Sequence, residues 1–292
     1  MKFTFLSDNT TEKACCEAEW GLSILIESGG HKVLFDVGAS DMFARNAANL
    51  GIDLGEVESV VISHGHYDHT TGMKYFFELN DKAWIYVHRK AFNGSFLMKE
   101  DGRLEDHDYG TPWQGDTVRK LIPRLEITHD VRKLNDCMTM VGDIPPLPEY
   151  PMAEKYFYLV REWNVIPPDA NFYTDEKGVL WVQDQMKHEQ FLAVSEGDGI
   201  YIFSGCCHVG VMAILARAKE LFPDKKIRGL IAGMHLYAFP KEKQAEIVDS
   251  ICALGLEWVF PVHCTGMDAV IMFKERLGDR CVIASAGQSY EL

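Results

Sequence analysis

The chain is poor in positively charged residues, and this shortage excludes a class of partners. Among 292 residues there are 29 lysines and arginines against 43 aspartates and glutamates, so the formal net charge is −14. DNA, RNA and anionic membranes carry the same sign of charge and repel such a protein. We therefore predict a small-molecule ligand, with no nucleic acid and no membrane as partner. A local basic pocket for an anionic ligand stays compatible with this balance.

Long apolar runs and regularly spaced cysteines are also missing. The amino terminus reaches an acidic residue, Asp8, too early for a secretory leader, and no apolar run approaches membrane-spanning length. The eight cysteines are too sparse for a disulfide scaffold, and the pairs Cys15-Cys16 and Cys206-Cys207 are adjacent rather than spaced as Cys-x-x-Cys. These features predict a cytoplasmic protein with reduced thiols, most of them small buried side chains.

Short apolar runs punctuated by Gly and Asp predict many strands and several helices. Expected strands lie at residues 3–6, 22–27, 32–35, 59–63, 84–87, 178–182, 191–195, 200–204, 226–232, 258–262 and 281–284. Expected helices, each with one apolar face, lie at residues 41–50, 73–79, 211–222, 245–252 and 270–277. A hairpin turn is expected at residues 28–31.

From about residue 90 to residue 171 this pattern breaks down, because charges and prolines interrupt it. Loops of this length are usually functional or disordered. We interpret the segment as an insertion that covers one end of a single core, with some strand structure at residues 132–141. A flexible linker between two domains is the alternative.

Three histidines and one aspartate lie within six residues after the predicted strand 59–63. They are His64, His66, Asp68 and His69. The alternating His64 and His66 can point to one side of an extended loop, whereas Asp68 and His69 can reach a second point nearby. Imidazole nitrogens and carboxylate oxygens are ligands that zinc and similar metals prefer. The run therefore predicts a metal site at the carboxyl end of a strand.

This run, His-x-His-x-Asp-His, resembles the defining loop of the metallo-β-lactamase superfamily, and the resemblance extends over nearly the whole chain. Phe35-Asp36-Val37-Gly38 is similar to the family's Asp-x-Gly element, which implies that Asp36 supports the metal loop without binding the ion. More narrowly, the chain resembles a branch named after 7,8-dihydropterin-6-methyl-4-(β-D-ribofuranosyl)-aminobenzene-5'-phosphate synthase. That likeness rests on Asn9 and on residues 50–54, 63–72, 205–210 and 263–266.

The resemblance implies an α+β fold, a four-layer αββα sandwich formed as one domain by residues 1–292. It also implies two divalent metal ions, zinc in the first place, with manganese, iron or nickel as alternatives. In the family, two leading histidines and a later one hold the first ion, and the aspartate, its adjacent histidine and a final histidine hold the second. Carried over, the ligands are His64, His66 and His208 for the first ion, and Asp68, His69 and His263 for the second.

Two positions stay open because the sequence departs from the family's motifs. His188, just before the predicted strand 191–195, is the rival of His208 for the third position at the first ion. The family's bridging aspartate is missing, since Gly205 is followed by Cys206. A thiolate could take its place, or Cys206 could be a small packed residue beside the site.

The implied chemistry is hydrolysis by a metal-activated water, for which Asp68 and His235 are the candidate catalytic residues. Asp68 would orient the water as well as bind metal. His235 follows another predicted strand and could bind substrate or protonate a leaving group, or it could cap the next helix.

We therefore predict a metal-dependent hydrolase of a small anionic or acyl substrate: a phosphoester, a thioester or a lactone. A pterin-pathway synthase using the same site is the alternative, followed by a metal-binding or sensing protein without turnover. A di-iron oxidoreductase is disfavoured, because His66 stands where that branch usually has Glu. A homodimer is the default assembly.

Overall fold

Short apolar runs form the strands of two large sheets in the computed structural model, which describes residues 1–160, 166 and 170–292. The strands of the first sheet are β1 (Lys2–Ser7), β2 (Ser23–Ser28), β3 (His31–Phe35), β4 (Ser59–Val61), β5 (Trp84–His88), β7 (Leu125–Thr128) and β17 (Ser289–Glu291). Those of the second are β8 (Val131–Lys133), β9 (Met138–Val141), β13 (Phe191–Glu196), β14 (Gly199–Ser204), β15 (Lys226–Gly233) and β16 (Trp258–Val262). Their orders are β17-β1-β2-β3-β4-β5-β7 and β16-β15-β14-β13-β9-β8.

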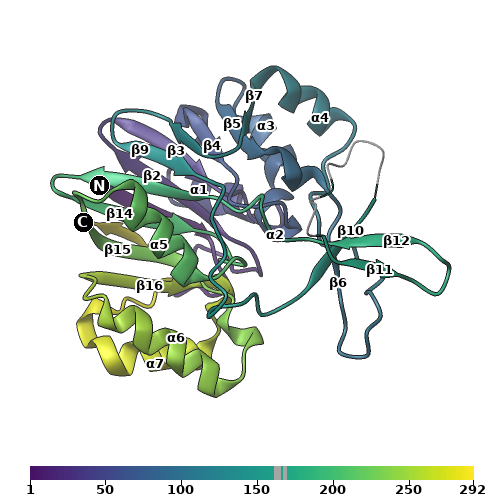
Figure 1. Ribbon diagram of the computed structural model, residues 1–292. Coiled ribbons are helices and arrows are strands. Elements are labelled where there is room, and N and C mark those ends of the chain that lie inside the picture. Colours follow the sequence, from purple (N-terminus) through teal and green to yellow (C-terminus); the bar gives the residue numbers. More distant parts are fainter. Residues whose placement is uncertain (161–165, 167–169) are drawn as a thin grey trace.

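The two sheets pack face to face over a core of aromatic and branched side chains (Figure 1). Phe3 of β1 lies at its centre, with ring centroids 5.3 Å from Phe203 of β14 and 5.2 Å from Phe260 of β16. Edge-to-face contacts of this kind stabilise a core beyond the area that they bury. The aromatic residues therefore tie the first sheet to the second.

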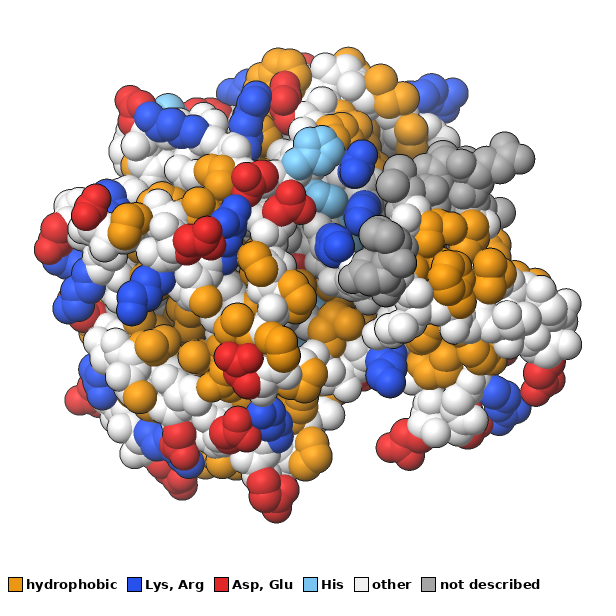
Figure 2. Space-filling view, viewed as in Figure 1, with side chains coloured by type: hydrophobic (Ala, Val, Ile, Leu, Met, Phe, Trp, Pro, Cys, Tyr) orange, Lys and Arg blue, Asp and Glu red, His pale blue; other side chains and the backbone are white. Residues whose placement is uncertain are grey.

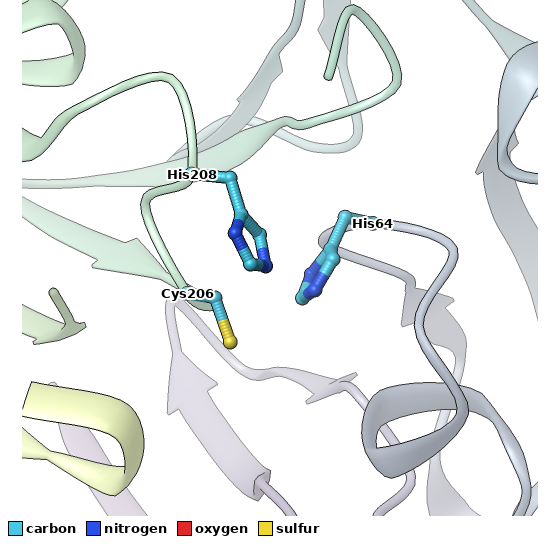
Figure 3. A group of neighbouring side chains, drawn as sticks. All are labelled: His64, Cys206 and His208. Atoms are coloured by element: carbon cyan, nitrogen blue, oxygen red, sulfur yellow. The ribbon is translucent and has the colours of Figure 1, made fainter. Parts of the chain in front are cut away.

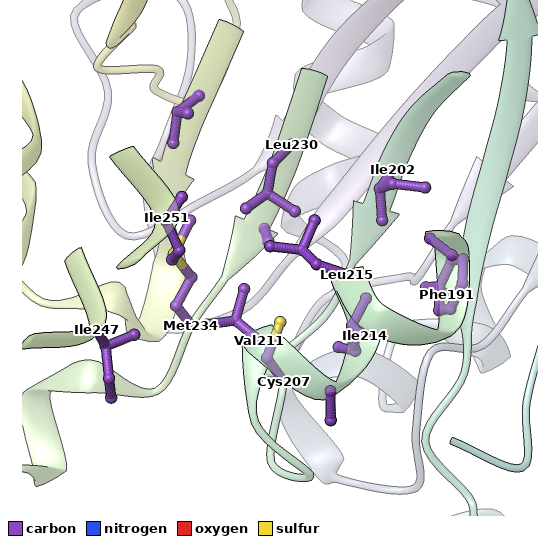
Figure 4. Packing of buried hydrophobic residues seen from close by; sticks show 14 of the residues in the cluster. Phe191, Ile202, Cys207, Val211, Ile214, Leu215, Leu230, Met234, Ile247 and Ile251 are labelled. Carbon is purple, nitrogen blue, oxygen red and sulfur yellow. The ribbon is translucent and has the colours of Figure 1, made fainter. Parts of the chain in front are cut away.

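Helices cover the outer face of each sheet. Their bounds are α1 (Met42–Asn49), α2 (Tyr67–Thr70), α3 (Met73–Leu79), α4 (Asp116–Leu121), α5 (Val211–Leu221), α6 (Lys241–Ala253) and α7 (Met267–Leu277). Helices α1 and α3 pack on the first sheet, and α5, α6 and α7 pack on the second. Figure 4 shows Ile214 and Leu215 of α5 facing Ile202 and Leu230 of the second sheet. The α+β architecture and the αββα layering are confirmed.

A third, smaller sheet projects beside the sandwich (Figure 1). Its strands are β6 (Phe96–Leu97), β10 (Tyr156–Leu159), β11 (Phe172–Thr174) and β12 (Leu180–Gln183). The segment expected as an insertion, residues 90–171, contributes strands to all three sheets, and the strand structure expected at 132–141 is the β8–β9 hairpin. Residues 161–165 and 167–169 of that segment lie outside the described residues. Among the residues that are described, no helix is long and apolar enough to span a membrane.

One predicted strand, residues 281–284, is wrong. Cys281 forms only an isolated bridge with Val259, and the chain then leaves the second sheet. The backbone N–H of Ala286 donates to Thr10 O, and β17 pairs with β1 of the first sheet. The chain therefore crosses from one sheet to the other where the apolar residues had indicated a strand, because the last strand completes the first sheet.

Candidate metal centre

Candidate site residues follow the carboxyl ends of parallel strands in both sheets. Asp36 follows β3 and His64 follows β4 in the first sheet, while Cys206, His235 and His263 follow β14, β15 and β16 in the second. Strands β3 and β4 are parallel, as are β14, β15 and β16. Side chains that follow parallel strands collect at one edge of a sheet, which is where α/β proteins bind ligands. The sandwich thus brings residues more than 200 positions apart, such as Asp36 and His263, to a common edge.

The first group of donor atoms contains His64, Cys206 and His208, whose nitrogen and sulfur atoms lie within 4.8 Å of one another. Figure 3 shows the two rings and the sulfur facing a common point. The ring of His66 completes the set, with its centroid 4.6 Å from that of His64 and 4.7 Å from that of His208. The structure therefore brings together all three histidines expected at the first ion.

The hydrogen bonds of these histidines leave ring nitrogens free to bind a cation. His64 Nδ1 lies 2.9 Å from Ser63 Oγ and His66 Nε2 lies 3.0 Å from Ser95 Oγ. The Nε2 atoms of His64 and His208 are buried and have no hydrogen-bond partner among the described residues. Buried polar atoms are almost always paired, and an unmatched one calls for an explanation such as a bound ion. These residues therefore fit a divalent metal ion.

The second group contains His69, Cys206 and His263, with donor atoms again within 4.8 Å of one another. His69 Nε2 lies 3.2 Å from Cys206 Sγ. Asp68 Oδ2 lies 3.2 Å from His263 Nε2 and 3.9 Å from His69 Nε2. Because Cys206 belongs to both groups, its sulfur lies between the two sets of predicted ligands, at the position where the family's bridging carboxylate was expected.

Asp36 fixes the loop that carries His64, His66, Asp68 and His69 through hydrogen bonds. Its carboxylate accepts hydrogen bonds from the backbone N–H and the Oγ of Ser63, both at 2.7 Å, and its Oδ2 lies 2.7 Å from His69 Nδ1. Burial lowers the pKa of His69, but the carboxylates of Asp36 and Asp68 outweigh burial and raise it to about 9. Asp36 thus fixes the ring so that Nε2 points toward Cys206.

Two further carboxylates that sequence reasoning missed position the later ligands. Glu189 accepts the backbone N–H groups of His208 at 2.7 Å and Val209 at 2.8 Å, and Asp8 accepts the N–H of His263 at 3.0 Å. Burial raises the pKa of Glu189 to about 7 and that of Asp8 to about 6. Asn9, noted for the resemblance alone, holds His263 Nδ1 at 2.9 Å.

His188 lies next to the first group but differs from it in its hydrogen bonds. Its Nδ1 accepts the backbone N–H of Gly65 at 3.1 Å, and its Nε2 lies 3.3 Å from Asp184 Oδ2. Both ring nitrogens are therefore engaged, whereas His208 keeps a free Nε2 in the cluster. The geometry favours His208 as the third ligand. His188 instead holds the loop in place through its hydrogen bond with Gly65.

The electrostatics of the centre favour the metal-binding forms of four predicted ligands, His64, His66, His208 and Asp68, whereas His69 is shifted the other way. Burial and the charges of neighbouring histidines lower the pKa values of His64 and His208 well below their usual range, and burial lowers that of His66 to about 3. Burial acts to raise the pKa of Asp68, but His69 and His263 outweigh it and hold that pKa well below its usual range. Neutral imidazoles and a carboxylate are the species that coordinate metals.

Burial disfavours the metal-binding form of Cys206, the thiolate, because it raises the pKa of the thiol well above its usual range. A nearby cation favours the thiolate, so this side chain needs a metal ion to act as an anionic ligand.

His235 lies beside the centre in an ion pair with Glu154. Its Nε2 is 2.5 Å from Glu154 Oε2, its ring centroid is 4.3 Å from that of His208, and one of its ring nitrogens lies within 4.8 Å of the sulfur atoms of Cys206 and Cys264. Burial lowers the pKa of His235, but hydrogen bonds to Cys264 and Glu154 raise it to about 10. Glu154, in the loop before β10, had no sequence signal, because a lone glutamate in a loop matches no motif.

The family model described as the metallo-β-lactamase superfamily matches residues 21–133. The chain is 28% identical over 270 residues to the uncharacterized protein MJ0448 of Methanocaldococcus jannaschii, covering 91% of each chain. It is 27% identical over 264 residues to the 7,8-dihydropterin-6-methyl-4-(β-D-ribofuranosyl)-aminobenzene-5'-phosphate synthase of the same organism, covering 88% of this chain and 85% of the relative. Both relatives are thus similar over most of their length.

Solved structures agree with the sequence comparisons. Tm1679, described as a metal-dependent hydrolase of the β-lactamase superfamily, superposes with a TM-score of 0.80 and 26% identity, covering 100% of this chain and 99% of that chain. The metallo-β-lactamase fold protein YhfI from Bacillus subtilis superposes with a TM-score of 0.51 at 13% identity, covering 99% and 98%, and shows the fold alone. Taken with the histidine and aspartate loop at the sheet edge, these comparisons show that the chain has the metallo-β-lactamase fold and that residues 21–133 are similar to the metallo-β-lactamase superfamily.

Proposed function

We propose that the protein is a metal-dependent hydrolase of a small anionic or acyl substrate, of the phosphoester, thioester or lactone class. The observation that carries this proposal is the meeting of two groups of buried donor atoms at one sulfur, Cys206, with unpaired imidazole nitrogens around it. Under this proposal two divalent ions, zinc in the first place, would be held by His64, His66 and His208 and by Asp68, His69 and His263, with Cys206 as a further candidate ligand.

Divalent ions bound there supply Lewis acidity, which lowers the pKa of a water molecule and stabilises negative charge on a substrate oxygen. The protein supplies orientation and proton transfer. Asp68 would accept a hydrogen bond from the attacking water. Glu154 holds Nε2 of His235, which leaves Nδ1 as the ring atom that would carry a proton for the leaving group.

A pterin-pathway synthase is the second candidate, and the specific observation in its favour is the similarity to the Methanocaldococcus synthase over 88% of this chain. Such an enzyme would use the same residues to bind ions that act as electrophiles. The two candidates share the metal centre and differ in the substrate.

Elemental analysis of protein purified without chelator tests the shared part first. We expect about two equivalents of zinc, manganese or iron per chain. The metal content should fall in Asp68→Ala and in His208→Ala, and it should stay unchanged in the control His31→Ala, whose side chain lies at the β2–β3 turn and pairs with Glu58. A content below about 0.2 equivalents, with no uptake when metal is supplied, would refute the proposal that these residues bind metal ions.

Activity then separates the two candidates. The metal-loaded protein should hydrolyse at least one phosphoester, thioester or lactone. The variant His235→Asn should keep its metal, while its kcat should be about 10²–10⁴-fold lower than that of the wild type. Asn suits this test because it tolerates the left-handed φ of 49° at position 235. A metal-loaded protein that hydrolyses none of the panel but converts a dihydropterin precursor would favour the synthase.

A further inference from the structure

A cavity of about 360 Å³ opens at the carboxyl ends of β5 and β7, and none of the proposed metal ligands lines it. Its lining residues are His88, Arg89, Lys90, His129, Asp143 and Lys187. Figure 2 shows Lys or Arg and His side chains gathered around a hollow on the face in view. The function proposed above makes no use of this cavity.

Four segments that are distant in sequence converge to build it. His88 is the last residue of β5, His129 directly follows β7, Asp143 follows β9, and Lys187 lies in the loop before β13. The cavity is therefore formed by the tertiary fold and not by one exposed loop. Such a convergence of side chains is a usual feature of a binding site.

The charge in the cavity is opposite in sign to that of the whole chain. Arg89, Lys90 and Lys187 supply three cations against the single carboxylate of Asp143, in a protein with a net charge of −14. Within the described part of the chain, none of these three cations forms an ion pair with a carboxylate, whereas other basic residues do, such as Arg228 with Asp198. As far as the described residues go, this positive charge is thus available to a ligand.

The positive groups also act on one another. Burial and then the charge of Lys187 lower the pKa of Lys90, with Arg89 adding to the effect, and the carboxylates of Asp184 and Asp143 oppose it only in part. Like charges held together at a partly buried site cost free energy unless an anion binds between them. The cavity therefore has the electrostatic character of a site for an anion.

We propose that this cavity binds a small polyvalent oxyanion, with the chemistry of a phosphate group, between Lys90, Lys187 and Arg89. One water takes about 30 Å³ of liquid volume, so the cavity is large enough for a phosphate together with part of an attached molecule. The ligand has two sources, a free inorganic anion or the phosphate group of a phosphorylated substrate. The site itself does not depend on the proposed hydrolase function.

The two lysines belong to segments that contact the metal loop. Lys187 precedes His188, whose Nδ1 accepts the N–H of Gly65, between the predicted ligands His64 and His66. Lys90 precedes Ala91, whose carbonyl oxygen lies so close to Gly65 that a Cβ added there would come within 2.4 Å of it. Each lysine is therefore one residue away from a contact with the loop that carries the predicted metal ligands.

Calorimetric titration of the metal-loaded protein with inorganic pyrophosphate tests the site. We expect the double variant Lys90→Gln/Lys187→Gln to bind pyrophosphate at least about tenfold more weakly than the wild type, and the loss to shrink as salt is raised. The matched control is Lys74→Gln/Lys82→Gln, which removes the same charge from exposed positions. Lys82 lies just before β5 and Lys90 just after it, so the two positions flank the same strand.

Equal affinity in the two double variants would overturn the proposal. So would binding that disappears in Asp68→Ala but is intact in Lys90→Gln/Lys187→Gln, because the anion would then lie on the metal centre. Metal content and thermal melting of each variant exclude misfolding as the cause of a loss. A protein without metal or hydrolytic activity would refute the proposed function while leaving the pyrophosphate titration as a separate result.

The source of the anion is decided by kinetics on phosphorylated and unphosphorylated forms of a substrate found in the ester screen. A raised KM in Lys90→Gln/Lys187→Gln for the phosphorylated form alone assigns the site to a substrate phosphate. Unchanged KM for both forms, together with weaker pyrophosphate binding, assigns it to a free anion.

Discussion

At the scale of single residues, Asp36 shows how a side chain that touches no substrate can govern a metal centre. It is fully buried and receives hydrogen bonds from the backbone and side chain of Ser63 while facing the ring of His69. Its φ of 58° lies in the left-handed region, which Asn and Asp adopt more readily than other non-glycine residues. The position therefore requires both a carboxylate and a residue that tolerates this backbone.

Asp36→Asn keeps the size and the backbone preference but replaces one acceptor oxygen with a donor. At least one buried donor then loses its acceptor, so we expect the free energy of unfolding to fall by about 1–3 kcal/mol. Metal affinity should fall by about 10–100-fold, because His69 is no longer oriented. Urea denaturation and competition with a chromophoric chelator measure the two effects.

Asp53→Asn is the control for that pair of measurements, because Asp53 accepts the N–H of Gly55 at the surface, a bond that Asn also makes. Metal affinity of Asp36→Asn equal to that of the control would show that the carboxylate does not support the ligand.

The site residues that sequence predicted and those that it missed differ in one physical respect. His64, His66, Asp68 and His69 form a dense run, and a dense run of ligand types is rare by chance. Asp8, Glu189 and Glu154 act singly, each through bonds to residues far along the chain, such as Glu189 to His208. A lone carboxylate carries no spacing pattern, so only the fold reveals what it contacts.

At the scale of elements, strands with one or both faces buried were predictable and the short ones were not. Strands such as β14 and β15 bury long apolar runs, which produce a clear pattern. The two-residue β6 and the three-residue β11 are too short for any periodicity. Strand β10 lies among prolines and charges, and its pairing with β12 is set by the third sheet rather than by its own sequence.

The segment that follows β14 contacts the segment that follows β4, and the two lie close together because residue 205 is a glycine. A Cβ at Gly205 would come within 2.2 Å of Ser63 Oγ and 3.2 Å of His64 Nδ1. We expect Gly205→Ala to push Cys206 and His208 away from His64, lowering metal affinity and costing about 1–3 kcal/mol of stability. Metal competition and urea denaturation test both effects.

The comparison variant is Gly255→Ala, since Gly255 has a φ of 68° and nothing within 4 Å of an added Cβ. Backbone strain alone should reduce its stability by about 1 kcal/mol without changing metal affinity. Equal metal affinities in the two alanine variants would rule out the close contact as a determinant of the centre.

At the scale of the whole molecule, the centre joins the two sheets at their common edge. His64, His66, Asp68 and His69 lie after β4 of the first sheet, while His208 and His263 follow strands of the second. The aromatic core around Phe3 joins the same two sheets from the inside. Under the proposed ligand assignment, ions would be held from both sheets and would bind the folded chain and not the unfolded one, so metal binding and folding would be coupled.

Removal of metal should therefore lower the stability of the entire protein and not only its activity. An ion present at 100 times its dissociation constant stabilises the folded state by about 2.7 kcal/mol. Removing the ion should therefore lower Tm by about 5–10 °C. Scanning calorimetry before and after chelation measures the fall, and return of the ion should reverse it.

The variants Asp68→Ala and His208→Ala give the internal control for this last experiment. Because each removes a ligand from one set, its Tm should already be lowered and should respond less to chelation than the wild type. A wild-type protein that loses its metal to the chelator and melts at an unchanged temperature would mean that the ligands are held in place by the hydrogen bonds of Asp36, Glu189 and Asp8 alone. The ion would then contribute to chemistry without contributing to the fold.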